Sequence, residues 1–188
     1  MSIWKNTTTI ASHSYTCGYC FNKVGPNEAF YASTGTSFIY ICPNCAKPTF
    51  FGPFNEQVPT PPLGRPVSGI SDTNLASLYR EAMDCSAVNA YTAAVLACRK
   101  ILMHVAVEKN AALNLSFAAY VDFLVDNGWV PPGSKAWVDT IRQKGNEANH
   151  EILLADKPAA TQVVHFTEML LRFIYELPSM VQSDTNPS

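Results

Sequence analysis

The sequence lacks long apolar runs and a strong charge of either sign. No apolar run approaches the roughly 18 residues that a membrane-spanning helix needs, so we expect a soluble protein. Only 15% of the residues are charged, the net charge is −2, and residues 73–188 hold nine Lys and Arg against twelve Asp and Glu. This balance argues against binding nucleic acid by bulk electrostatics, although it is compatible with a local basic patch. With 47% hydrophobic residues, the composition also excludes a disordered chain and a coiled coil.

Several motifs of enzymes and of exported proteins are absent as well. The chain contains no Walker-type Gly-Lys-Ser/Thr, no Gly-x-Ser-x-Gly and no His-Glu-x-x-His, so ATPase, serine hydrolase and zincin activities have no support. Residues 1–10 are mixed and polar, without the apolar core of a secretory signal. We therefore expect a reducing, cytoplasmic compartment.

Two Cys-x-x-Cys pairs stand out among the residues that are present. Cys17 and Cys20 are separated from Cys42 and Cys45 by 21 residues. Two such pairs are typical of a tetrahedral zinc site in which each tight turn, or knuckle, provides two thiolates. The alternatives are two disulfides, which a reducing compartment disfavours, and a redox pair, which normally accompanies a βαβ pattern that is missing here. Four thiolates fill the coordination sphere, so the sequence predicts a structural zinc ion.

The chain shows three kinds of segment. Residues 1–54 are predicted to form a small β zinc ribbon, with aromatic and β-branched strands at 29–33 and 37–41 and an edge strand at 49–54. Residues 55–72 contain a dense run of prolines and are expected to be an extended linker. From residue 73 the apolar residues recur with helical spacing.

The helical region predicts the fold class, which is mainly α. We expect helices over about 73–84, 88–110, 117–126, 135–144 and 156–176, with caps at Asp72 or Thr73, Ser116 and Asp156. Together they predict a bundle of about five helices over residues 73–180, preceded by the zinc ribbon and followed by a tail at 181–188. The second helix has a wide apolar face suited to the bundle centre, made of Ala94, Val95, Ala97, Cys98, Ile101, Leu102, Val105 and Ala106.

Residues 142–150, Arg-Gln-Lys-Gly-Asn-Glu-Ala-Asn-His, form the unusual stretch that we call the signature. If it is helical throughout, Arg142, Asn146 and His150 stand four residues apart on one stripe. If it breaks, Gly145 ends one helix and Asn146 caps the next. In either case a cation, an amide and an imidazole gather near one spot and could hold a phosphate, with His150 as acid or base. The alternative is a capped helix junction whose histidine hydrogen-bonds across the bundle.

Segments 78–82, 91–102 and 141–150 resemble a bacterial HEPN-like family, domain of unknown function 4145. The resemblance covers about residues 74–178, and a zinc ribbon at the N-terminus is a common companion of this family. It implies a four- or five-helix bundle, usually dimeric. Many HEPN domains are metal-independent endoribonucleases of toxin, antiphage and CRISPR systems. The resemblance therefore implies a defence or toxin-type protein that forms a homodimer and acts on RNA.

The HEPN motif is an arginine followed by four to six residues and then a histidine. The resemblance assigns His150 to the motif histidine, which helps to activate the RNA 2′-hydroxyl, and Asn146 to the polar residue that often follows the arginine. Gly145 stands where the arginine is expected, Arg142 precedes His150 by seven intervening residues, and Lys144 has the spacing without the guanidinium. A non-catalytic HEPN-like module that binds a partner protein, a nucleotide or nucleic acid is therefore the alternative to an endoribonuclease.

Overall fold

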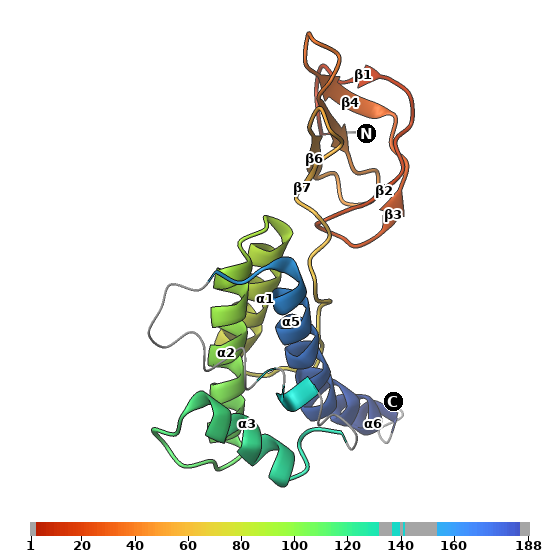
Figure 1. Cartoon of the computed structure of the whole chain (residues 1–188). Coiled ribbons are helices and arrows are strands. Elements are labelled where there is room, and N and C mark those ends of the chain that lie inside the picture. The colour runs from red at the N-terminus through yellow and green to blue at the C-terminus, as the bar shows by residue number, and fades with distance from the viewer. Residues whose placement is uncertain (1–2, 132–136, 140, 142–153, 185–188) are drawn as a thin grey trace. The chain divides into compact units, whose positions relative to one another are not determined.

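The computed structural model describes residues 3–131, 137–139, 141 and 154–184. The chain divides into two compact units, residues 1–62 and residues 63–188. The strands belong to the first unit and the helices to the second (Figure 1). The boundary falls inside the proline-rich segment 55–72, so each unit contains a part of that segment.

The first unit contains an antiparallel sheet of five short strands and a separate two-stranded hairpin. The order in the sheet is β1-β4-β5-β6-β7. These strands are β1 (Thr8–Thr9), β4 (Glu28–Tyr31), β5 (Phe38–Ile41), β6 (Pro48–Phe51) and β7 (Gln57–Val58). The hairpin pairs β2 (Tyr15–Thr16) with β3 (Lys23–Val24). The expected strands at 29–33, 37–41 and 49–54 are therefore present, with ends that differ by up to three residues.

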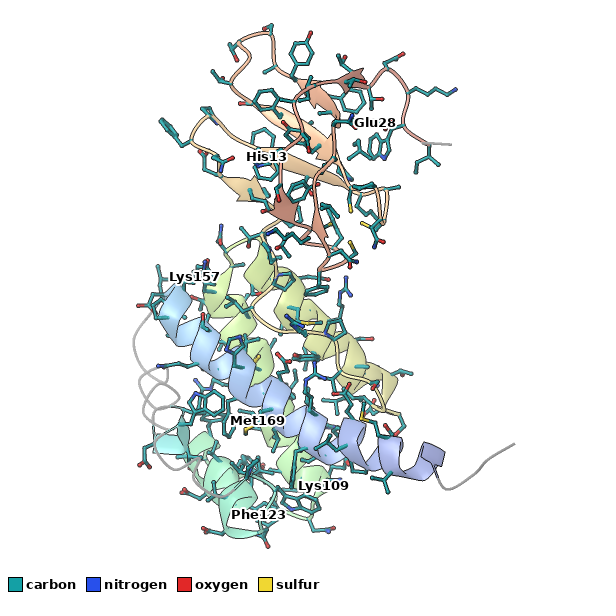
Figure 2. All side chains as sticks on the ribbon, turned by 90° about the vertical axis from the view of Figure 1, so that its right-hand side faces the viewer. His13, Glu28, Lys109, Phe123, Lys157 and Met169 are labelled. Atoms are coloured by element: carbon teal, nitrogen blue, oxygen red, sulfur yellow. The ribbon has the colours of Figure 1, made fainter. Side chains whose placement is uncertain are left out.

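One face of the sheet is buried, because successive side chains of a strand point to opposite faces. Ala29, Tyr40 and Thr49 are cross-strand partners on this face and are at most 6% exposed. The ring of His13 packs against it, 5.2 Å from the ring centre of Tyr40 and 4.4 Å from that of Phe51 (Figure 2). A buried cluster of this size provides little hydrophobic stabilisation, so the unit needs a further source of stability.

The start of the segment expected to be a linker is part of the sheet. β7 pairs with β6 through Phe50 opposite Val58 and Phe51 opposite Gln57. The side-chain amide of Gln57 also donates hydrogen bonds to the carbonyl oxygens of Thr16 at 2.8 Å and Pro59 at 3.0 Å. Residues 57–59 are thus held by the first unit, through contacts that the proline content of the segment does not reveal.

The second unit is helical in its described part. The elements are α1 (Thr73–Ala87), α2 (Tyr91–Glu108), α3 (Phe117–Asp126), α5 (Lys157–Leu171), the π-helical turn η2 (Arg172–Glu176) and α6 (Leu177–Asp184). Residues 137–139 and 141 are also helical, and the remainder of the expected helix at 135–144 lies outside the described residues. None of the helices described here is long and apolar enough to cross a membrane.

Side chains cap three of the helices at their first turns, as the sequence predicts. Each cap accepts a hydrogen bond from a backbone N–H that has no partner within the helix. The shortest of these bonds measures 2.8 Å for α1, 3.2 Å for α3 and 2.8 Å for α5. The capping residues are Asp72, Ser116 and Asp156.

Helix α2 packs against α1, α3 and α5 and lies at the centre of the helical core. Figure 1 shows α1, α2 and α5 side by side, with α3 near one end of α2. Six of the eight residues predicted for the apolar face of α2 are fully buried, and Val95 and Ala97 are partly buried against the core. The fully buried residues are Ala94, Cys98, Ile101, Leu102, Val105 and Ala106.

Candidate metal centre

The two cysteine pairs lie in turns of the same geometry. Cys17 and Cys20 follow β2, and Cys42 and Cys45 follow β5. In each turn the first cysteine accepts a backbone hydrogen bond from the residue four positions later, at 3.0 Å in the first turn and 2.9 Å in the second. That later residue has a positive φ in both turns, 62° in the first and 55° in the second. The chain therefore builds two matching knuckles that present their thiols on one side.

The four thiols come together in space. All four Sγ atoms lie within 4.8 Å of one another, with 3.8 Å between Cys17 and Cys45 and 3.7 Å between Cys20 and Cys42. These separations are too long for disulfide bonds, whose S–S length is about 2.05 Å. Four sulfurs held at about 2.3 Å around a tetrahedral ion would be about 3.8 Å apart. The arrangement thus fits a single metal ion at the centre of the four sulfurs.

The thiols differ in how readily they ionise. Burial raises the pKa of Cys17, and burial together with the neighbouring thiols raises the pKa of Cys45 to about 12. Burial also opposes ionisation of Cys20, but hydrogen bonds from Asn22 and Asn44 outweigh it and lower the pKa of Cys20 to about 6. Four adjacent thiolates would repel one another in this partly buried place. A divalent cation at the centre would compensate their charge.

Four protein sulfurs complete a tetrahedral coordination sphere and leave no position for a water molecule or a substrate. His13, a conceivable alternative ligand near the first knuckle, is stacked in the aromatic cluster instead. Among the described residues, only the four cysteines form a group that could hold a metal ion in this way. A metal ion bound here would stabilise the fold of the first unit and would have no open site for catalysis.

Gly18 and Gln57 support the first knuckle, and the cysteine spacing gives no indication of either. A Cβ atom added at Gly18 would lie 2.7 Å from the carbonyl oxygens of both Pro59 and Thr60. Residues 59 and 60 can therefore lie against the first knuckle only because residue 18 has no side chain. Gln57 holds the same stretch through its bonds to Thr16 and Pro59. A glycine between the two cysteines of a Cys-x-x-Cys pair is the signal in the sequence that could have indicated this close approach.

The residues predicted for the second candidate site lie outside the described residues. These are Arg142, Asn146 and His150, together with Gly145. The chain just before them is part of the helical core, because Val138 and Ile141 are 4% and 1% exposed.

Two further histidines of the helical unit make polar contacts within that unit. His104 Nε2 lies 3.3 Å from Asp72 Oδ2, and His165 Nε2 lies 2.6 Å from the carbonyl oxygen of Leu63. Both contacts join helices to the chain on either side of residue 70. These contacts are consistent with structural roles for both side chains.

Comparison with known proteins gives one match. The sequence profile of a family described as Domain of unknown function (DUF4145) matches residues 80–185, which is more than half of the 188-residue chain. No curated protein and no solved structure matches the chain. The matched region begins within α1 and includes the other helices and the signature, whereas the four cysteines lie before it. The chain belongs to the DUF4145 family, and it carries a four-cysteine cluster ahead of the family region.

Proposed function

We propose that this chain is a HEPN-like protein of a bacterial or phage defence or toxin-type system, with RNA as its substrate and cleavage of RNA as its activity. The observation that carries the proposal is the signature at 142–150, which falls inside the region matched by the family. In this proposal His150 acts as acid or base at the RNA 2′-hydroxyl, Arg142 steadies the scissile phosphate and Asn146 provides a polar contact. We further propose a cytoplasmic homodimer that pairs through the helical unit.

Zinc is the metal that we propose for the four-cysteine cluster. Tetrahedral sets of four sulfurs suit zinc or an iron–sulfur cluster, and the 3.7 and 3.8 Å separations match the edges of a tetrahedron around one ion. Such a zinc ion has no open coordination position, so its role is structural. RNA cleavage by this protein would then be independent of metal chemistry, as the HEPN resemblance implies.

The Gly18→Ala variant is expected to bind zinc at least about tenfold more weakly than the wild type, because its methyl group displaces the chain that covers the first knuckle. Competition with a chromophoric chelator measures the affinity. Gly25→Ala is the matched control, since its Cβ would meet only the Ser12 hydroxyl at 3.2 Å. Equal affinities in the two variants would show that the contact with Pro59 and Thr60 does not support the metal site.

Cleavage of a mixed RNA pool is the direct test of the proposed activity. We expect the zinc-loaded wild type to cleave RNA without added divalent metal, and the His150→Ala variant to be at least about a hundredfold slower, because general acid–base catalysis contributes about that much or more. Reactions in chelator are paired with zinc-replete reactions, since a chelator could remove the structural ion. Arg142→Ala tests the phosphate contact in the same assay.

The controls separate a lost activity from a lost fold. Far-UV circular dichroism and zinc content of His150→Ala should equal those of the wild type. Cleavage that persists unchanged in His150→Ala would assign the activity to a contaminant or to another site, and would contradict the proposal.

A non-catalytic HEPN-like interaction module is the second candidate, and Gly145 at the position of the motif arginine favours it. In this case the helical unit binds a partner protein, a nucleotide or nucleic acid. The same experiment distinguishes the two functions. Absence of cleavage by both the folded wild type and His150→Ala, together with a ligand or protein that co-purifies with both, would support the module.

A further inference from the structure

Residues 63–70, which we call the strap, cross the helical unit without forming a helix or a strand. Figure 1 draws the strap within the yellow stretch of chain that precedes α1. Its main-chain N–H and C=O groups have no partners in a regular element, so they must find partners elsewhere. Three N–H and three C=O groups of the strap find them on side chains of α1, α5 and η2.

Side chains of the helices bind the strap through its main chain in both directions. Three strap N–H groups donate, from Leu63 to Ser86 Oγ at 3.0 Å, from Arg65 to Glu168 Oε2 at 3.1 Å and from Ser68 to Glu176 Oε1 at 3.4 Å. Three strap carbonyls pair with helix groups, Leu63 with His165 Nε2 at 2.6 Å, Arg65 with the Tyr79 hydroxyl at 2.9 Å and Pro66 with Arg172 Nη2 at 3.2 Å. These six contacts recognise an extended backbone. One strap side chain adds to them, because the Ser68 hydroxyl donates to Glu176 Oε1 at 3.0 Å.

Ion pairs hold the helix side chains in place for this task. Arg172 Nε lies 2.9 Å from Glu168 Oε1, and Arg172 also pairs with Glu176. The three residues are spaced by four along α5 and η2, so they form one charged row. Each of the three also hydrogen-bonds to the strap main chain. The row therefore presents donors and acceptors that fit an extended peptide.

Two glycines allow the strap to lie against the helices. A Cβ atom at Gly64 would come within 2.8 Å of the Tyr79 hydroxyl and 3.0 Å of Val164 Cγ1. Gly69 has a φ of +78°, and a Cβ atom there would lie 2.6 Å from the carbonyl oxygen of Tyr175. Larger residues at these two positions would displace the strap, while the helix side chains that bind the strap keep their identity.

The buried cluster of the helical unit contains no residue of the strap. Every residue that forms its buried part lies between Leu75 and Ile174, and the strap adds only the partly buried side chains of Leu63, Val67 and Ile70. Segments with few buried apolar contacts and with exposed hydrogen bonds open at low free energy, while the core stays folded. The hydrogen bonds from Arg65 and Ser68 are both solvent-exposed.

We propose that the groove between α1 and the α5–η2 face is a binding site for an extended peptide, and that the strap occupies it in cis as a releasable latch. Side chains of the groove bind the main chain of the strap, and the glycines permit the close approach. The partly buried side chains of Leu63, Val67 and Ile70 fix the position of the strap along the groove. The ligand of the groove is thus the sequence of residues 63–70 itself.

A fluorescent peptide of residues 60–72 tests the proposal on the full-length chain. We expect a Gly64→Val/Gly69→Val variant, in which the strap is displaced, to bind this peptide at least about tenfold more tightly than the wild type, whose groove is filled. Arg65→Ala is the matched control, because the Arg65 side chain is exposed and only its main chain bonds to the groove. It should bind the peptide as weakly as the wild type.

Hydrogen exchange of the wild type provides a second test that does not require the variant to fold. The amides of Arg65 and Ser68 should exchange at least about tenfold faster than the core amide of Leu102, because the latch opens without unfolding the helices. Exchange of the strap amides at the rate of the core would overturn the latch. A folded double variant that binds the peptide no better than the wild type would overturn the peptide site.

Discussion

The Cys17→Ser variant is expected to lose the proposed zinc ion and, with it, the fold of residues 1–62. A serine hydroxyl does not replace a thiolate as a zinc ligand, and a three-sulfur site is open to water. Structural zinc ions contribute about 10–16 kcal/mol of binding free energy, and this binding is coupled to folding. The buried cluster of the first unit has only six residues, of which two are the cysteines at positions 17 and 42. Without the ion, too little buried surface remains to order the sheet.

Metal analysis and NMR measure this effect. Zinc content should fall from one ion per chain to near zero, and the indole N–H signal of Trp4 should move, because Trp4 Nε1 donates to the carbonyl of Ala46 at 2.7 Å in the second knuckle. Helical circular dichroism should persist, since the helical core is a separate cluster.

Cys85→Ser is the control for this prediction. Cys85 belongs to α1 and lies outside the four-cysteine cluster. Zinc content should therefore stay at one ion per chain. Full zinc content in Cys17→Ser, or loss of zinc in Cys85→Ser, would contradict the assignment of the ligands.

Phe166→Ala is expected to destabilise the helical unit by about 3–5 kcal/mol, the usual effect of removing a large aromatic side chain from a core. Phe166 is fully buried in α5 and packs edge-on against Trp137 with 6.1 Å between the ring centres. Its removal leaves a cavity that neighbouring helices close only in part. For a unit of this size, the melting temperature should fall by roughly 10–20 °C.

Thermal unfolding followed by circular dichroism measures the difference, with Phe173→Ala as the control. Phe173 is the same residue type in the continuing helix, but it is 38% exposed. Its removal should therefore cost clearly less stability than the loss of Phe166. Equal destabilisation by the two variants would show that burial at position 166 does not govern the stability of this unit.

Interactions between residues close in the sequence made the helix caps, the buried face of α2 and the two cysteine pairs predictable. The caps at Asp72, Ser116 and Asp156 act on backbone groups two or three residues away, so the residue type and the following apolar spacing are sufficient. The buried face of α2 follows from the helical period in the same way. The four cysteines were predictable as a group, because each pair is local and the ligand chemistry requires the two pairs to meet.

Contacts between residues far apart in the sequence could not be predicted from local sequence patterns. The proline-rich segment 55–72 predicts a linker, yet the structure places β7 in the sheet and the strap against the helices. The bond from Arg65 to Glu168 spans 103 residues, and neither residue type indicates the other. The proposed roles of Arg142, Asn146 and His150 remain predictions from the sequence, since these residues lie outside the described part of the chain.

The sequence by itself placed the start of α2 about three residues too early and expected a tail at 181–188, where α6 continues to Asp184. It determined the helical character of the larger unit, the starts of α1, α3 and α5 and the grouping of the four cysteines. These depend on interactions within a few residues or on side-chain chemistry alone. Only the tertiary structure decided that Pro59 and Thr60 pass so close to Gly18 that a side chain has no room there. It also decided that the row of charged residues on α5 and η2 binds the strap. Such close approaches arise when packing brings distant segments together, and the hydrogen-bonding needs of an irregular backbone then select their partners.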